Sequence, residues 1–286
     1  MLIVHSNFLC YDQKQMNNSS ILEFIKKSPK AELHLHIEGT LEPEQMFLLA
    51  KRNNVQIPFK NINEAKKAYN FSNLESFLKI YYEGTKVLLK EKDFFELAWA
   101  YALKCKEDNI VHTEIFFDPQ THTNRGISFD IVINGIYKAL KKATENNFIT
   151  VAHAGEEGPP EYMWEALNLL NVKRIDHGVQ CLKDKKLVEK LLKNQVPLTV
   201  CPLSNIKLKV FDKLNDHNLK KMLDKKLMVT INSDDPAYFG GYLNQNLIET
   251  QAALNLSFED IKTLLINSFK SSFLSEERKK EYINKI

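Results

Sequence analysis

Short apolar runs of the kind that form strands recur along the chain and are separated by stretches with helical periodicity. The runs lie at residues 31–36, 111–117, 149–153, 174–177, 197–201 and 227–232. Between them, apolar residues return at helical spacing, as at Phe94, Leu97 and Tyr101. Strands that alternate with helices predict parallel βα units.

The connection between the first two predicted strands is longer than a simple crossover needs. Residues 40–110 contain three helical stretches, and an insertion of this kind after a barrel strand commonly forms a lid over the site. No internal repeat or Pro/Gly-rich linker divides the chain. We therefore expect one domain, residues 28–286, after an N-terminal extension of residues 1–27. An α/β barrel of roughly 250 residues fits this length.

The first predicted strand carries two histidines, His34 and His36, separated by a single residue. Residues i and i+2 of a strand point to the same side, so both imidazoles would face one point, as a metal site requires. Because this motif is short, two unrelated histidines in a half-buried strand remain an alternative.

Further polar residues stand at the ends of later strands. His153 ends the third strand, and Glu156 follows across a glycine, where it can donate a proton or simply begin a helix. His177 ends the fourth strand and is either functional or a satisfied core histidine. Asp234 and Asp235 follow the sixth strand, where paired carboxylates bind a metal or cap a turn.

These residues reinforce one another because the carboxyl ends of barrel strands meet at one face, where barrel enzymes carry their chemistry. His34, His36, His153 and Asp234 would supply nitrogen and oxygen ligands suited to Zn²⁺. Glu156 and His177 would remain for proton transfer. The combination predicts a metal hydrolase.

Composition narrows the partners and the location. The chain has 39 basic and 36 acidic residues, a net charge of +3, which gives no electrostatic case for nucleic acid or an anionic membrane. No stretch approaches the ~18 apolar residues of a membrane span. The four cysteines form no C-x-x-C pair. We expect reduced thiols and a cytoplasmic protein, with the nucleus as an alternative, and the oligomeric state is not predicted.

The chain resembles the adenosine/adenine deaminases of the metal-dependent amidohydrolase superfamily. The shared motifs are HLHIEGTLEP at 34–43, HAGEEGP at 153–159, DHG at 176–178, CPLSN at 201–205, SDDPAYFGGY at 233–242 and NSFKSSFL at 267–274. The resemblance runs from about residue 28 to the end of the chain. It implies a (β/α)8 barrel with a helical lid, one zinc ion per chain and a small purine substrate.

Individual roles also follow from the resemblance. It implies that zinc is bound by His34, His36, His153 and Asp234. Glu156 would protonate N1 of the purine, and His177 would orient and deprotonate the attacking water. Asp235 would bond to the N7 edge of the purine.

The residue at position 38 distinguishes between substrates within the family. Adenosine deaminases have a shorter acidic residue at this position, near the ribose, whereas Glu38 and the PAYFGGY sequence resemble the branch that acts on free adenine. The longer side chain would fill space that a ribose needs. Adenosine and N6-modified adenine nucleosides or nucleotides remain alternative substrates.

The chain departs from the family between Phe117 and Ile149. Only 31 residues lie there, whereas the family has two further strands and helices, roughly 60 residues of a ~250-residue barrel. The junction is expected near residues 139–146. Six strands cannot close like eight, so two strand edges would be exposed. A glycine-containing loop that contacts the purine in the family has no counterpart. A truncated non-catalytic isoform or binding protein is therefore a further alternative.

Overall fold

The computed structural model describes residues 18–140, 151–169 and 172–286. Six parallel strands lie within a few residues of the predicted positions; residues 149–150 of the third predicted strand are outside the described part. The strands are β1 (Lys30–His36), β2 (Ile110–Phe116), β3 (Val151–Ala154), β4 (Arg174–His177), β5 (Leu198–Val200) and β6 (Val229–Ile231).

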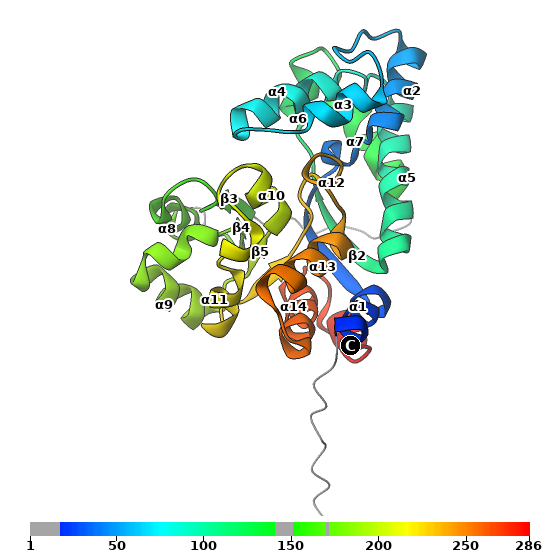
Figure 1. Cartoon of the computed structure of the whole chain (residues 1–286). Helices are drawn as coiled ribbons and strands as arrows, with labels where there is room; N and C mark the ends of the chain where they lie inside the picture. Colours follow the sequence, from blue (N-terminus) through cyan, green and yellow to red (C-terminus); the bar gives the residue numbers. More distant parts are fainter. Residues whose placement is uncertain (1–17, 141–150, 170–171) are drawn as a thin grey trace, which may run out of the picture.

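The strands form one open, curved sheet in two groups. β1 pairs with β2, and β3, β4, β5 and β6 pair in that order, all in parallel (Figure 1). The segment after β6 joins the groups, because the His36 amide donates to the Asp234 carbonyl at 3.0 Å and the Asp234 amide donates to the His34 carbonyl at 3.1 Å. The order across the sheet is therefore β2, β1, β6, β5, β4, β3.

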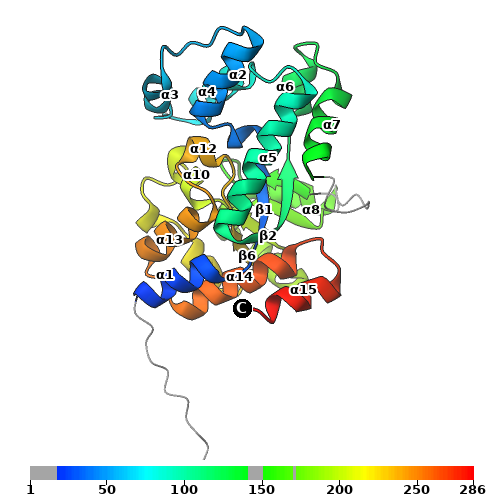
Figure 2. The same ribbon diagram turned by 90° about the vertical axis from the view of Figure 1, so that its right-hand side faces the viewer.

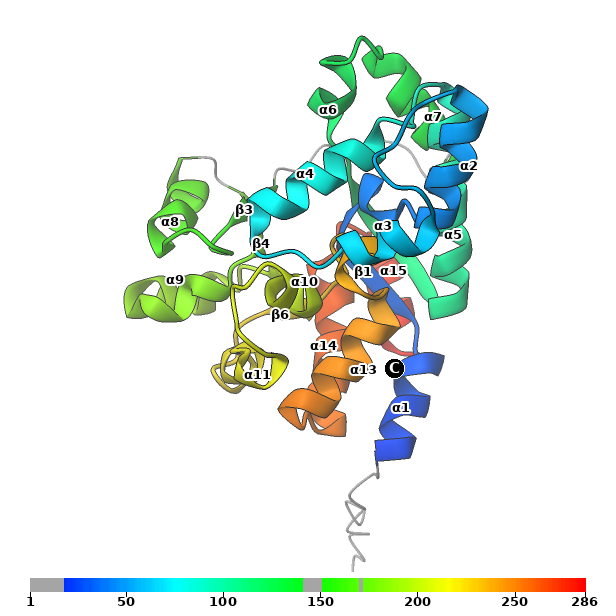
Figure 3. The same ribbon diagram turned by 45° about the horizontal axis from the view of Figure 1, so that its top comes forward.

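The outer edges of β2 and β3 pair with no other strand in the described part of the chain. Every residue of β1 before His36 is buried, whereas Ile110 is the only fully buried residue of β2. β1 has neighbours on both sides and β2 has one. The prediction of six strands with two exposed edges is confirmed for the described residues, and Figure 1 shows β2 well separated from β3. Figure 2 shows β2 beside β1, and Figure 3 shows β3 beside β4.

Four α-helices, not the three predicted, connect β1 to β2. After the short 3-10 helix η1 (Glu38–Thr40), these are α2 (Pro43–Asn53), α3 (Ile62–Ala68), α4 (Leu74–Thr85) and α5 (Glu91–Asp108). Asn61 and Asn73 each accept a hydrogen bond from a backbone amide three residues later, so each begins a separate helix. α2, α3 and α4 lie over the carboxyl ends of β1 and β2, as predicted for a lid (Figure 1).

The other helices surround the strands. They are α1 (Asn18–Lys27), α6 (Pro119–Thr123), α7 (Phe129–Leu140), α8 (Pro160–Asn168), η2 (Val179–Lys183), α9 (Lys185–Asn194), α10 (Pro202–Lys207), η3 (Leu214–Asp216), α11 (Leu219–Asp224), α12 (Pro236–Phe239), α13 (Leu243–Leu254), α14 (Phe258–Ser271) and α15 (Glu276–Ile283). α14 begins with the predicted capping box of Ser257 and Asp260. α1, at the end of the predicted extension, buries Ile21 and Ile25 in the core.

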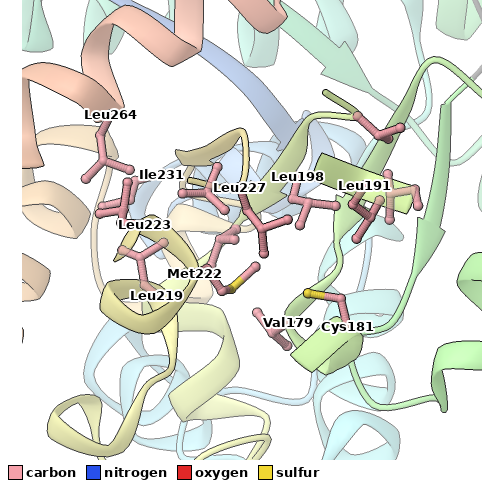
Figure 4. Packing of buried hydrophobic residues seen from close by; sticks show 14 of the residues in the cluster. Val179, Cys181, Leu191, Leu198, Leu219, Met222, Leu223, Leu227, Ile231 and Leu264 are labelled. Atoms are coloured by element: carbon pink, nitrogen blue, oxygen red, sulfur yellow. The ribbon is translucent and has the colours of Figure 1, made fainter. Parts of the chain in front are cut away.

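The largest hydrophobic cluster fills the space between β4–β6 and the helices outside them. Figure 4 shows Leu198 of β5 and Ile231 of β6 packed with Leu191, Met222 and Leu264 from α9, α11 and α14. Each such side chain contributes about 1.5–3 kcal/mol when fully buried. This half of the sheet therefore holds its strand ends rigidly although the barrel is open.

Candidate active site

The predicted site residues gather at the carboxyl ends of the strands. His34 and His36 extend from the same side of β1, His153 lies in β3, and His177 ends β4. Asp234 follows β6 and is bonded to β1 through its backbone. Because parallel strands end at one rim, residues distant in the sequence meet there.

The four predicted metal ligands form two overlapping sets: the ligand atoms of His34, His36 and His153 lie within 4.8 Å of one another, and Asp234 lies within this distance of His34 and His36 but not in one set with His153. The Nε2 atom of His153 lies 3.0 Å from that of His34 and 3.3 Å from that of His36. Oδ1 of Asp234 lies 3.5 Å from His34 Nε2 and 3.6 Å from His36 Nε2. Metal bonds of about 2.1 Å place tetrahedral ligands about 3.4 Å apart. The spacing and the donor types therefore fit a metal ion.

The charge balance of the cluster also fits a cation. Burial alone would lower the pKa of His34, but the carboxylates of Asp176 and Asp234 raise it to about 9. The imidazoles conversely hold the pKa of Asp234 well below its ordinary value in spite of its burial. The two carboxylates thus favour positive charge on His34, whereas burial together with that charge lowers the pKa of His36 and of His153. A proton can occupy only one nitrogen, whereas a divalent ion is shared by all.

His34 is oriented by residues behind it. Its Nδ1 lies 3.1 Å from Thr199 Oγ1, and that hydroxyl donates to Asp176 Oδ1 at 2.7 Å. The hydroxyl proton is thus used, so Nδ1 of His34 carries a proton, and Nε2 is the ring atom that would bind a metal ion in place of its own proton. Arg174 Nε donates to the same Asp176 oxygen at 3.2 Å, and the Arg174 guanidinium also pairs with Glu114.

Backbone strain aims two of the side chains into the site. His177 and Asp234 have φ angles of 70° and 64°, in the left-handed region that few non-glycine residues adopt. Such conformations cost roughly 1–3 kcal/mol and cluster at functional sites. Gly39 meets a different constraint, since a Cβ there would lie 1.9 Å from Asp235 Oδ1. Only glycine lets η1 approach Asp235 this closely.

Glu156 and His177 have the protonation states that proton transfer requires. Burial, together with the nearby charge of Asp234, raises the pKa of Glu156 to about 8. Burial and the positive charge of His34 lower the pKa of His177 to about 3. Oε1 of Glu156 and Nδ1 of His177 lie 3.4 Å apart. Near neutral pH the site therefore has a carboxylic acid that can donate a proton and a neutral imidazole that can accept a hydrogen bond.

Asp235 and Glu38 occupy different surroundings. Asp235 lines the pocket, and its buried Oδ1 has no hydrogen-bond partner in the described structure. Burial, reinforced by Asp234, raises the pKa of Asp235 well above its ordinary value. Glu38 is buried behind the wall, where Oε1 accepts from His122 Nε2 at 2.9 Å and from the Asp118 amide at 3.1 Å. It does not line the pocket directly.

A pocket of about 500 Å³ opens in front of these residues, a size typical of small-molecule sites. One wall is polar; it consists of His36, His153, Glu156, His177, Asp234 and Asp235. The lid forms the facing wall with Phe77, Tyr81 and Tyr82 of α4. Flat aromatic surfaces opposite hydrogen-bonding groups suit a planar heterocycle. His153 itself is exposed, because β3 is an edge strand.

Several residues of the site were not singled out from the sequence. Asn205 belongs to a motif that gave it no role, and its Nδ2 donates to Glu156 Oε1 at 3.0 Å. His217 lies behind Asn205 and belongs to no motif. Thr199 is a polar residue inside the otherwise apolar strand predicted at residues 197–201, and this was the only signal in the sequence that could have identified it. The lid aromatics could have been found from the Phe77 to Tyr81 spacing, which places both on one helical face.

Comparison with known proteins assigns the chain to a group. The family profile described as Adenosine deaminase matches residues 29–150 and 137–286. The chain is 48% identical to the adenine deaminase of Acinetobacter baylyi, over 95% of this chain and 99% of that protein. It is also 48% identical to the adenine deaminase of Wolinella succinogenes, over 93% and 99% of the two chains.

One solved structure gives the same assignment, and a second shares the fold. The adenine deaminase of Arthrobacter aurescens is 38% identical, with a TM-score of 0.87 over 90% of this chain and 98% of that one. A zinc-bound amidohydrolase from Burkholderia ambifaria is 19% identical, with a TM-score of 0.80 over 94% and 93%, and shares the fold. No helix in the described part of the chain is long and apolar enough to cross a membrane.

The comparisons also locate the absent segment. The alignment with the Acinetobacter baylyi protein has 332 positions, and 95% of this chain fills about 272 of them, so about 60 positions of the relative have no counterpart. The two matches to the family profile overlap at residues 137–150, which is where the chain passes from one matched part of the profile to the other. The prediction that two βα units are missing here is confirmed. All four candidate metal ligands lie outside this segment.

Proposed function

The chain belongs to the adenosine deaminase family, and we propose that it hydrolyses free adenine to hypoxanthine and ammonia, a reaction of purine salvage. The observation that carries the proposal is the meeting of three imidazole nitrogens and the Asp234 carboxylate beside Glu156 on the wall of one pocket. This is the constellation that a hydrolytic deaminase needs: metal ligands, a proton donor and a proton acceptor around one reacting carbon.

We propose that His34, His36, His153 and Asp234 hold one zinc ion. Nitrogen and oxygen donors without thiolates are a common ligand set for catalytic Zn²⁺. When bound, such an ion lowers the pKa of a water ligand toward about 7 and so supplies hydroxide at neutral pH.

The remaining residues move protons and hold the base. Glu156, neutral near pH 7, would donate a proton to N1 of the ring, which makes C6 more electrophilic. His177 would accept a proton from the attacking water and orient it toward C6. Asp235 lines the pocket with an unpartnered oxygen and would bond to the N7 edge. Water adds at C6 and ammonia leaves, so adenine and water become hypoxanthine and ammonia.

Free adenine is favoured over a nucleoside by the surroundings of Glu38 and by the names of the relatives. His122 Nε2 and the Asp118 amide hold the Glu38 carboxylate, so the side chain keeps its place behind the pocket wall and not in the pocket itself. Arg125 Nη2 donates to His122 Nδ1 at 2.8 Å and fixes the ring that holds Glu38. We propose that Glu38 limits the pocket from behind its wall.

The open edge affects substrate binding more than metal binding. The ligands and Glu156 are all present, whereas the two absent units would flank the pocket between β2 and β3. His153 is exposed on this side. We therefore propose turnover of adenine with a higher KM than that of the full-length relatives.

The test is ammonia release from adenine, adenosine and N6-methyl-AMP by the zinc-loaded chain. We expect adenine to be the preferred substrate, and the Glu156→Gln variant to lose the activity while it keeps its zinc. A folded chain that binds zinc stoichiometrically and deaminates none of the three substrates would contradict the proposal. That result would support the non-catalytic alternative.

A further inference from the structure

Two buried side chains connect Glu156 to the backbone of a neighbouring helix. Asn205 of α10 is fully buried, and His217, just before α11, is 3% exposed. Neither has a role in the reaction proposed above. Neither is among the residues that line the pocket.

The backbone fixes the tautomer of His217. The Leu219 amide donates to His217 Nδ1 at 3.1 Å, and an amide N–H can only donate. Nδ1 must therefore offer its lone pair, so a neutral His217 carries its proton on Nε2. Burial lowers the pKa of His217 to about 4, which keeps the ring neutral at physiological pH.

The tautomer of His217 in turn fixes Asn205. His217 Nε2 lies 3.1 Å from Asn205 Oδ1 and donates to it. The Asn205 amide must then direct its nitrogen the other way, and Nδ2 donates to Glu156 Oε1 at 3.0 Å. The backbone of Asn205 is held separately, through bonds to Cys201 and Val210. The side chain of Asn205 thus connects His217 to Glu156.

The hydrogen bond from Asn205 to Glu156 distinguishes the two carboxyl oxygens of Glu156. An NH₂ group can only donate, so Oε1 accepts from Asn205 whether or not it carries the acid proton. Because an oxygen without a proton is the better acceptor, this bond favours the proton of the neutral acid on Oε2. The carbonyl of Glu156 is held by Gln180 Nε2 at 2.8 Å, which fixes the backbone but leaves the carboxyl rotation to Asn205.

We propose that His217 and Asn205 are positioning residues, which orient the Glu156 carboxyl so that Oε1 accepts from Asn205 and the proton of the neutral acid is favoured on Oε2. The consequence for turnover rests on the proposed deaminase function; the hydrogen-bond relay itself does not. The relay is the series of hydrogen bonds from the Leu219 amide through His217 and Asn205 to Glu156. Because a backbone amide can only donate, each later bond in the series has one possible direction, and the Glu156 carboxyl is held in one orientation.

A matched pair of substitutions at position 217 tests the consequence for turnover. His217→Gln places an amide nitrogen near the position of Nε2 and can still donate to Asn205. His217→Asn keeps an acceptor for the Leu219 amide but is too short to reach Asn205. We expect His217→Asn and Asn205→Leu each to lower kcat by about 10- to 100-fold, because a general acid contributes about 10²–10⁴-fold and a misoriented acid loses part of this. KM should change by less than about threefold. We expect His217→Gln to remain within about threefold of the parent chain.

Zinc content and unfolding temperature, measured on every variant, separate positioning from a structural role. A similar loss of kcat in His217→Gln and His217→Asn, or a kcat that neither substitution changes, would overturn the proposal. If the parent chain shows no turnover, the proposed function fails and the relay is still decided by nitrogen NMR of ¹⁵N-histidine-labelled protein. We expect His217 as the neutral Nε2-protonated tautomer, and the Nδ1-protonated or cationic form would overturn the inference.

Discussion

The Nε2 atoms of His34 and His153 lie 3.0 Å apart although 119 positions separate the residues. The Nδ1 proton of His34 is directed to Thr199, so Nε2 is the nitrogen of this ring that faces His153. A third ring nitrogen, from His36, joins them. A cation shared by the three ring nitrogens is the simplest way to make their close approach favourable.

Replacing His153 by Ala removes the ligand that contacts both other imidazoles. We expect zinc content to fall from about one per chain to a small fraction, and activity on adenine to fall by more than about 100-fold. Metal analysis after gel filtration and an ammonia assay measure the two effects. His112→Gln is the control, since His112 pairs with Glu114 on β2 away from the cluster and its replacement should leave zinc content unchanged.

Zinc should stabilise the folded chain, because the ligands converge only in the folded state. A ligand present at 100 times its Kd contributes about 2.7 kcal/mol, which corresponds to a rise in Tm of about 5 °C for a domain of this size. Thermal unfolding with zinc and with excess chelator measures the shift. In Asp234→Asn the shift should largely disappear, and an equal shift in that variant would place the stabilising ion elsewhere.

The pH dependence of turnover should report on Glu156. Its pKa is raised to about 8 by burial and by Asp234, so the neutral acid predominates below that value and is lost above it. We expect kcat/KM for adenine to fall as the pH rises through about 8. Initial rates from about pH 6 to about pH 10 test this. A rate that keeps rising across the whole range would show that the proton does not come from Glu156.

Arg174 should be essential for stability, because it neutralises two carboxylates inside the sheet. It is 2% exposed, pairs with Glu114 and Asp176, and donates to the Leu33 carbonyl at 2.9 Å. Arg174→Met leaves buried charges unpaired, which typically costs about 3–5 kcal/mol. Chemical denaturation measures the loss. Lys27→Met, which removes a cation from an exposed pair with Glu23, should change stability by less than about 1 kcal/mol.

Restoring the absent units should close the sheet. In a chimera, residues 141–150 are replaced by the corresponding segment of the Acinetobacter baylyi protein. New partners for the edges of β2 and β3 should lower the tendency to self-associate and raise Tm by several degrees, roughly 5 °C. KM for adenine should decrease by about tenfold as the pocket gains its missing wall. A Gly/Ser insert of equal length is the control and should produce none of these changes.

The sequence alone determined the strands, their order along the chain and the residues that end them. His34 and His36 were predicted to face one side because alternation in a strand is a local property of the backbone. The absence of two units was also visible, since the distance from Phe117 to Ile149 is a matter of counting. The lid was predicted as three helices because two asparagine caps between apolar stretches gave too weak a signal.

Tertiary structure decided what supports and limits the site. Nothing near His217 in the sequence connects it to Glu156, and Glu38 is separated from His122 by 84 positions. These contacts depend on how strands and loops approach one another across the barrel rim, and on which polar atoms burial leaves without water. Local patterns determine which residues reach the rim, whereas packing determines which atoms meet there and in which protonation state.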